Sequence, residues 1–371
     1  MTSPAQTVTP ITAAASGTVT YSLSRDLIAR LASINASLAF TSYQSGYLYM
    51  LGISPNGGAQ LHQSEMPKPM GLASTDRGQL VLATNASIIH FENILDPGQR
   101  INQVYDACFM PRTQYVTGHL DAHDVGILTN GEIIFVNTRY NCLATLSERH
   151  SFKPVWKPSF ISDIVDEDRC HLNGLAMREG IPAYVTSVSR SNTIDGWRDR
   201  RGDGGVVIDV QRNAIVCEGL SMPHSPRWHN GRLYVLNAGT GELGWVDFGD
   251  SGADPSTAES AMGVFRPIAF CPGFLRGLAF AENYAFVGLS RPRYQRFEGL
   301  DLDRRLLEAD SEAWCGVQVI DLETGHCTDW FRIDGDVGEL YDVELVRGFG
   351  CPMTVSPDSK DAAALITFEK S

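Results

Sequence analysis

The sequence has 371 residues, of which 43% are hydrophobic, with a formal net charge of −13 and a pI near 5.1. This acidic balance argues against a nucleic-acid partner, because such a surface requires clustered basic residues. No run of about eighteen apolar residues occurs, so we expect no membrane span and no membrane partner. The 35 glycines and 18 prolines suit many short strands joined by tight turns.

Residues 1–17 are rich in Thr, Ala, Ser and Pro and lack the charged start and apolar core of a signal peptide. We interpret this segment as a disordered tail, followed by a single domain over residues 18–371. Eight cysteines without Cys-x-x-Cys spacing indicate neither a zinc knuckle nor a disulfide framework. Free thiols are typical of a reducing compartment, and we therefore expect a cytoplasmic protein.

A short helix is predicted over residues 27–38, because its leucines and isoleucine fall on one helical face. Strand-like runs follow over residues 39–43, 46–52 and 60–62. These three runs have no preceding strand that would serve as the innermost strand of their sheet.

The rest of the chain repeats one pattern about every fifty residues, with four apolar or alternating runs divided by turn residues. The clearest copy begins at His171 and continues through 183–188, 205–210 and 214–217. The other copies begin at Met70, His123, His224, Arg276 and Glu339. A period of this length with four strands is typical of a β-propeller blade. The copies predict an all-β fold, a six-bladed β-propeller.

The last copy has an inner strand over residues 341–346 and then little but a polar tail. It therefore complements the three early strands, which lack an inner strand. We expect strands from both termini to complete the last blade, since closing the ring removes unpaired sheet edges.

Two loops, over residues 190–204 and 291–314, are too long to be simple turns, and the second contains a helical-looking stretch over 302–310. Both follow the second strand of a blade. In a meander that loop lies on the same face as the start of the first strand. Long loops in compact folds are usually functional or disordered, so this shared face is the candidate site.

Polar residues stand where the first strand of each copy begins, and we expect them to converge on the propeller axis. The candidate catalytic residues are His123, Asp124, His171, Asn173, His224 and Asp342. The candidate substrate-binding residues are Arg227, Arg276, Glu339, Lys68, Trp197 and Arg293.

This set supports two main chemistries. His123, His171 and His224 are a candidate metal site for Zn, Fe or Cu, because imidazole is a common ligand of these ions. Without a metal, a histidine beside a carboxylate is a competent general base, and an arginine binds an anion. We expect at least one of Arg227 and Arg276 to remain free to bind an anionic ligand.

Calcium is a third option, with Asp124, Asn173, Glu339 and Asp342 as oxygen ligands. This arrangement resembles that of gluconolactonase-like six-bladed hydrolases in architecture only. Their pattern includes a carboxylate in the first blade, where this sequence has Lys68-Pro69-Met70.

Three longer motifs carry a family resemblance: Asp168-Arg169-Cys170-His171-Leu172-Asn173-Gly174, Met222-Pro223-His224-Ser225-Pro226-Arg227-Trp228 and Pro272-Gly273-Phe274-Leu275-Arg276-Gly277-Leu278. The chain resembles an uncharacterised bacterial family, described as a conserved hypothetical protein or domain of unknown function. The resemblance extends from about residue 41 to about residue 343 and implies family membership without an activity.

The sequence therefore favours an enzyme of hydrolase, lyase or isomerase type that acts on a small anionic metabolite or a peptide. The alternative is a non-catalytic propeller that binds a peptide or partner protein through the same face, for which Trp197, Trp314 and Tyr294 are the candidate contacts. The sequence does not indicate an oligomeric state.

Overall fold

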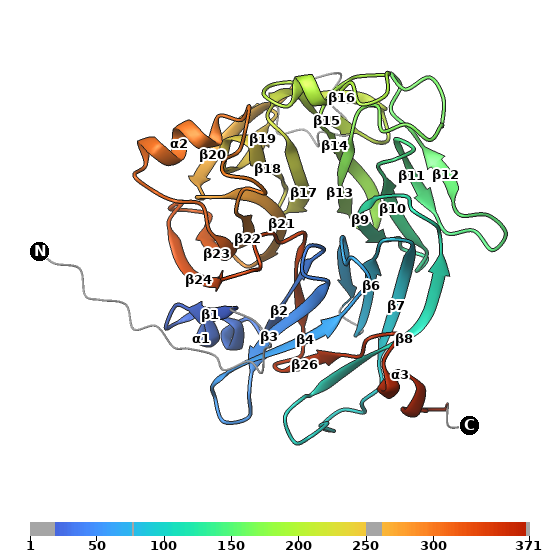
Figure 1. Ribbon diagram of the computed structural model, residues 1–371, viewed down its shortest axis with the longest axis vertical. Coiled ribbons are helices and arrows are strands. Elements are labelled where there is room, and N and C mark those ends of the chain that lie inside the picture. Colours follow the sequence, from blue (N-terminus) through green and yellow to red (C-terminus); the bar gives the residue numbers. More distant parts are fainter. Residues whose placement is uncertain (1–18, 76–77, 250–261, 369–371) are drawn as a thin grey trace, which may run out of the picture.

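The computed structural model describes residues 19–75, 78–249 and 262–368. Within them, six sheets surround a central axis, which confirms the predicted all-β, six-bladed β-propeller (Figure 1). The predicted tail over residues 1–17 lies outside the described residues. No helix in the described ranges has the length and apolar character that crossing a membrane requires.

Blades 1 to 3 follow the chain, each running from the inner to the outer strand. Blade 1 contains β5 (Leu72–Thr75), β6 (Gln79–Ala83), β7 (Ser87–Asn93) and β8 (Ala107–Val116). Blade 2 contains β9 (Ala122–Ile127), β10 (Ile133–Asn137), β11 (Cys142–Thr145) and β12 (Lys153–Trp156). Blade 3 contains β13 (Leu172–Arg178), β14 (Ile181–Ser187), β15 (Gly205–Asp209) and β16 (Ala214–Leu220).

Blades 4 to 6 complete the ring. Blade 4 contains β17 (Pro223–His229), β18 (Arg232–Asn237), β19 (Glu242–Asp247) and β20 (Val264–Phe270). Blade 5 contains β21 (Phe274–Ala281), β22 (Tyr284–Ser290), β23 (Cys315–Asp321) and β24 (Cys327–Asp334), with β1 (Thr20–Leu23) on its outer edge. Blade 6 contains β25 (Val343–Arg347), β2 (Ala36–Ser42), β3 (Tyr47–Ile53) and β4 (Ala59–Glu65).

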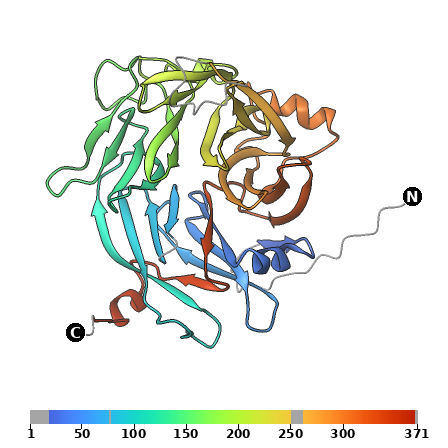
Figure 2. The same ribbon diagram turned by 180° about the vertical axis from the view of Figure 1, so that it is seen from behind.

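Blade 6 joins the two ends of the chain, as predicted. Its inner strand β25 pairs antiparallel with β2, with Phe40 opposite Val343 and Ala36 opposite Arg347. Figure 2 shows β25, in red, on the inner side of the blue strands of this blade. The ring is therefore closed by hydrogen bonds between segments that lie far apart in the sequence.

The predicted helix over residues 27–38 is too long. Helix α1 (Leu27–Ser33) ends before Asn35, whose φ of +47° is incompatible with a continuing right-handed helix. All seven residues of β2 are buried between β25 and β3. The burial of this whole segment in the sheet outweighs the helical spacing of its leucines. The helical stretch expected over residues 302–310 does form a helix, α2 (Leu302–Glu308), between β22 and β23.

Two strands were not predicted. Strand β1 extends blade 5, and β26 (Pro352–Thr354) pairs parallel with β8 on the outer edge of blade 1. The C-terminal segment thus contains a strand and helix α3 (Lys360–Ala364) where the sequence indicated only a polar tail.

The apolar core is divided among the interfaces between neighbouring blades. Leu80 of blade 1 packs in one cluster with Leu48 of blade 6, and Val81 of blade 1 in the next cluster with Phe135 of blade 2. Equivalent clusters join each following pair of blades. Because these contacts stabilise the ring between the blades, polar residues are free to occupy the central axis.

Candidate active site

Seven residues form a closed chain of contacts at the face where the inner strands begin. The chain connects side chains of blades 2 to 5 with the segment that leads into blade 6. We call it the mouth ring, and it consists of His123, His171, Asn173, His224, Phe274, Arg276 and Tyr341.

One half of the mouth ring is made of aromatic groups that meet edge-on, together with Arg276. The ring centroid of His123 lies 5.0 Å from that of His171 and 5.6 Å from that of Tyr341. The guanidinium carbon of Arg276 lies 4.9 Å from the centroid of the Tyr341 ring. Arg276 is therefore held over an aromatic face, which attracts its positive charge.

The other half of the mouth ring consists of residues from blades 5, 4 and 3. The same guanidinium lies 5.5 Å from the ring of Phe274, whose edge meets His224 at a centroid distance of 5.3 Å. The Nε2 atom of His224 lies 3.1 Å from the amide nitrogen of Asn173. Since Asn173 and His171 belong to the same entry segment of blade 3, the contacts close into a ring.

Backbone turns orient two of the histidines. Asp121 and Met222 have φ angles of +56° and +48°, a left-handed conformation that reverses the chain just before each inner strand. Their carbonyl oxygens lie 2.8 Å from Nδ1 of His123 and 2.7 Å from Nδ1 of His224. Each Nδ1 therefore donates a hydrogen bond, and the lone pair of each neutral ring is on Nε2.

His171 has a different partner. Its Nδ1 atom lies 2.6 Å from a carboxylate oxygen of Asp168, and its ring stacks on Trp197 at a centroid distance of 4.1 Å. The carboxylate accepts the Nδ1 proton, which leaves Nε2 as the basic atom of the imidazole. Trp197 comes from the long loop after β14, so the predicted placement of this loop over the entry face holds for this residue.

Burial keeps two of the three histidines neutral. Desolvation lowers the pKa of His123 to about 4, with Asp121 opposing the shift. Burial also lowers the pKa of His224 well below its usual value, and Arg276 adds to this effect. Because Nε2 of His224 accepts the Asn173 amide proton, its lone pair is already engaged.

A second polar group lies at the axis and is fully paired. Arg227 donates to both oxygens of Asp124, at 2.7 and 3.3 Å, and lies 3.5 Å from a carboxylate oxygen of Asp342. It also donates to the carbonyl oxygen of Leu175 at 3.0 Å. We call Arg227, Asp124 and Asp342 the axial cluster.

The axial cluster also connects the blades. Asp124 accepts the backbone N–H of Leu175 in blade 3, and Asp342 accepts that of Leu72 in blade 1. Arg227 thus lies between two of the residues considered for calcium and is paired with both, whereas its role in substrate binding stays a prediction.

Arg276, in contrast, lacks an anionic partner. In the part of the chain that the structure describes, it forms no ion pair, and its Nε is buried without a hydrogen-bond acceptor. The Tyr341 hydroxyl, the second oxygen of Asp168 and the Trp197 indole nitrogen are likewise buried without partners there. Buried polar atoms normally have partners, so these four atoms are available to form hydrogen bonds with a ligand.

The remaining predicted residues lie at the rim. Arg293 binds Glu339 through its Nε at 2.9 Å, and both contact the hydroxyl of Tyr43. These residues border a cavity of about 600 Å³ next to Tyr294. Lys68, at the entry of blade 1, is exposed. Glu339 is therefore neutralised by Arg293 and does not join Asp124 and Asp342.

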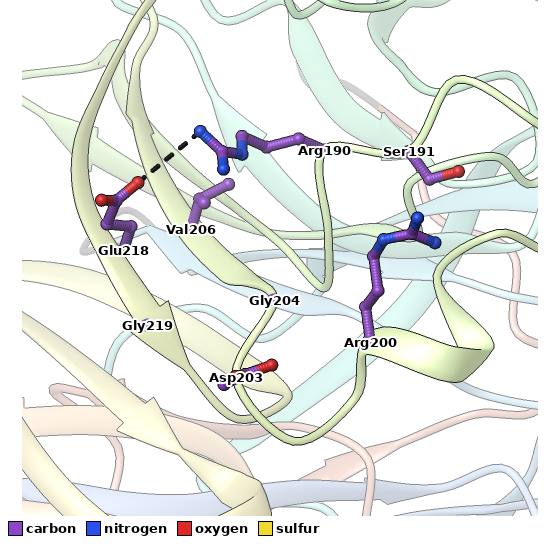
Figure 3. Close-up of a pocket in the computed structure, with 8 residues that line it drawn as sticks. All are labelled: Arg190, Ser191, Arg200, Asp203, Gly204, Val206, Glu218 and Gly219. Atoms are coloured by element: carbon purple, nitrogen blue, oxygen red, sulfur yellow. Dashed lines mark ion pairs between the residues drawn. The ribbon is translucent and has the colours of Figure 1, made fainter.

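Another cavity, of about 380 Å³, lies beside the loop after β14, away from the mouth ring. Figure 3 shows Arg190 on one side of it, paired with Glu218 at 3.6 Å, and Arg200 on the other. Its charged groups are exposed, and none of its lining residues belongs to the mouth ring or the axial cluster.

The described residues contain no group of three or more His, Cys, Asp or Glu side chains placed to hold a metal ion. His123, His171 and His224 lie in one ring, yet Asn173 takes the Nε2 atom of His224. Metal binding by these histidines therefore stays a prediction that requires this hydrogen bond to break.

Three members of the site were missed from the sequence: Asp168, Tyr341 and Phe274. Asp168 stands three residues before His171, a signal that the sequence did contain. Tyr341 and Phe274 resemble ordinary strand aromatics in the sequence, and only the fold places them around Arg276.

Comparisons with solved structures found chains of similar fold at low sequence identity. The chain is 12% identical to a chain of the nidogen/laminin complex, with a TM-score of 0.51, covering 84% of this chain and 99% of that one. A putative oxidoreductase (glucose dehydrogenase) from Thermus thermophilus is 11% identical, with a TM-score of 0.43 and coverages of 71% and 91%. Virginiamycin B lyase from Staphylococcus aureus is 10% identical, with a TM-score of 0.39 and coverages of 88% and 93%.

No curated protein matches the sequence. A family model, in contrast, matches residues 25–355, which include every blade and the whole mouth ring. By this match, the chain belongs to the family described as Domain of unknown function (DUF4915).

Proposed function

We propose that the protein is an enzyme that uses acid–base chemistry on a small anionic substrate bound at the mouth ring. The observation that carries this proposal is the Asp168–His171 pair in the same ring as Arg276, which has no anionic partner among the described residues. His171 acts as the general base through Nε2, and Arg276 binds the anionic group of the substrate.

The geometry supports a division of roles between the two residues. Asp168 fixes the tautomer of His171, and the stack on Trp197 fixes its ring plane. Such orientation is what a general base needs in order to meet a substrate proton. A free guanidinium beside it binds a carboxylate or phosphate and stabilises developing negative charge.

The alternative, a non-catalytic platform for a peptide or partner protein, has weaker support. Of the three aromatic residues considered for it, Tyr294 is 87% exposed, whereas Trp197 is 7% exposed and stacked on His171. Interaction surfaces expose their aromatic residues, while this site encloses titratable groups.

Anion binding can be measured by isothermal titration with acetate, succinate and inorganic phosphate. We expect one of them to bind the wild-type protein and to lose at least about tenfold in affinity in Arg276→Gln, because a charge-assisted contact is removed. Arg266→Gln, an exposed arginine paired with Asp247, is the matched control and should bind as the wild type does. Absence of anion binding in the wild type contradicts the proposal.

Catalysis can be tested by mass spectrometry of a mixture of small carboxylic and phosphorylated metabolites. We expect the wild-type protein to convert a component that His171→Gln leaves unchanged. Binding that depends on Arg276 without any conversion would favour the non-catalytic alternative.

A metal-dependent form of the same proposal makes a different prediction. It requires stoichiometric Zn, Fe or Cu in protein purified without a histidine tag. The metal should be lost in a His171→Ala, His224→Ala double variant, because both ligands are removed. Active protein without metal would leave only the acid–base form.

A further inference from the structure

A second charged side chain at the mouth also lacks a partner. Asp121 stands at the entry of blade 2, where its backbone carbonyl holds His123 and its side chain is exposed. Within the described ranges, its carboxylate forms no hydrogen bond or ion pair. The backbone of Asp121 thus orients His123, whereas its carboxylate does not stabilise the described part of the fold through a hydrogen bond or an ion pair.

Asp121 and Arg276 face the same part of the mouth. The His123 ring, anchored on the Asp121 carbonyl, contacts Tyr341, and Arg276 lies over the Tyr341 ring. The Asp121 carboxylate and the Arg276 guanidinium also lie close enough to interact electrostatically. The two opposite charges therefore influence each other, yet they do not form an ion pair in the described structure.

Resting on the proposed function, we propose that the substrate is a small zwitterion, a free amino acid or a close analogue, which spans the gap between these two residues. Its carboxylate binds Arg276, and its ammonium group binds Asp121. A simple anion would satisfy Arg276 alone and would place its negative charge near Asp121. A zwitterion satisfies both groups.

The surroundings fit such a ligand. Phe274 and Tyr341 lie under Arg276, and Trp197 lies against His171. An ammonium group is also attracted to aromatic faces. The site should be specific for both ends of the ligand. An analogue that lacks the carboxylate leaves Arg276 unpaired, and one that lacks the ammonium group leaves Asp121 unpaired.

The test is a titration of the full-length protein with the common L-amino acids, followed by matched derivatives of the best binder. The N-acetyl derivative retains the carboxylate and loses the ammonium charge, whereas the amide derivative does the opposite. We expect either change to weaken binding by about tenfold or more, which is the loss of one charge-assisted contact.

Two variants assign the contacts. Asp121→Asn keeps the left-handed turn, which Asn tolerates, and should weaken the amino acid about tenfold while leaving the N-acetyl derivative unaffected. Arg276→Gln should weaken both ligands. Asp334→Asn, a half-exposed aspartate paired with Arg332 in an outer strand, is the control and should change neither affinity.

The outcomes separate the two proposals. If simple carboxylates bind as tightly as amino acids, depend on Arg276 and ignore Asp121→Asn, the zwitterion proposal is wrong and the anionic-substrate proposal stands. If phosphate binds through Arg276 but no amino acid does, only the zwitterion proposal fails; if no carboxylate, phosphate or amino acid binds, both proposals fail.

Discussion

The axial cluster and the mouth ring each contain one arginine that comes from the start of an inner strand, yet the two arginines have opposite surroundings. Arg227 is paired with two aspartates and donates to a carbonyl oxygen. Arg276 lies between two aromatic rings and has no anionic partner among the described residues. The same residue type in equivalent segments thus stabilises the fold in one place and is left available in the other.

Under the proposed function, this difference separates a stabilising region of the axis from a ligand-binding one. Buried ion pairs are strongly destabilising when one partner is removed, so the axial cluster tolerates little change. An unpaired charge near the surface costs stability and persists when it serves another purpose. Substitutions in the two regions should therefore have opposite effects on stability.

The largest effect is expected for Arg227→Met. The substitution leaves Asp124 buried without its cation, and the free energy of unfolding should fall by about 3–5 kcal/mol. Urea denaturation measures this loss. Adding Asp124→Asn should recover part of it, because the uncompensated charge is then removed. Equal stability of Arg227→Met and the wild type would show that the axial cluster does not stabilise the fold.

A smaller effect concerns pH and His123. Its pKa is about 4 in the folded protein and about 6.5 in an unfolded chain. Between these values the unfolded state binds more protons, so acidification destabilises the folded state by about 1.4 kcal/mol per pH unit. When the pH falls from 6.5 to 5, the free energy of unfolding of His123→Asn should therefore fall by about 2 kcal/mol less than that of the wild type.

The variant is needed for this comparison because protonation of another group changes the free energy of unfolding in the opposite direction. Burial raises the pKa of Asp342 to about 8, so its protonation favours the folded state as the pH falls from 8 towards 4. The difference between the wild-type and His123→Asn urea curves cancels that contribution. Parallel pH dependences of the two proteins would contradict a buried, neutral His123.

The smallest effect, with the opposite sign, is expected for Arg276→Met. Removing a charge that lacks a partner should leave the free energy of unfolding unchanged or raise it by up to about 1 kcal/mol. Urea denaturation without added ligand measures this change, while anion binding should be lost. A destabilisation as large as that of Arg227→Met would mean that Arg276 also belongs to the fold.

The blades could be predicted from the sequence because each inner strand is a short apolar run that follows a polar turn. The prediction was wrong at residues 34–38, because over so few residues the spacing of the apolar side chains fits both a helix and a strand. Pairing with β25 makes residues 36–40 part of a strand. Strands β1 and β26 were missed since they are edge strands, which are defined mainly by their neighbours.

The convergence of the histidines was predictable from their equivalent positions, but the fates of the two arginines were not. Register shifts interrupt β17 between His224 and Arg227, and β21 between Leu275 and Leu278. A bulge of this kind changes which way the following side chain points. The position of such a bulge cannot be read from an alternating pattern of apolar and polar residues. The sequence alone therefore left both arginines as candidate anion-binding residues.

The closure of blade 6 has a consequence for protein synthesis. Thr41 and Asp342, which hydrogen-bond across this junction, are separated by 301 residues. At ordinary translation rates, about 15–60 s pass between their emergence from the ribosome. During this time β2 presents an unpaired edge, which is a template for association with other chains. The nascent chain is thus expected to depend on chaperones that cover this edge until the last blade is complete.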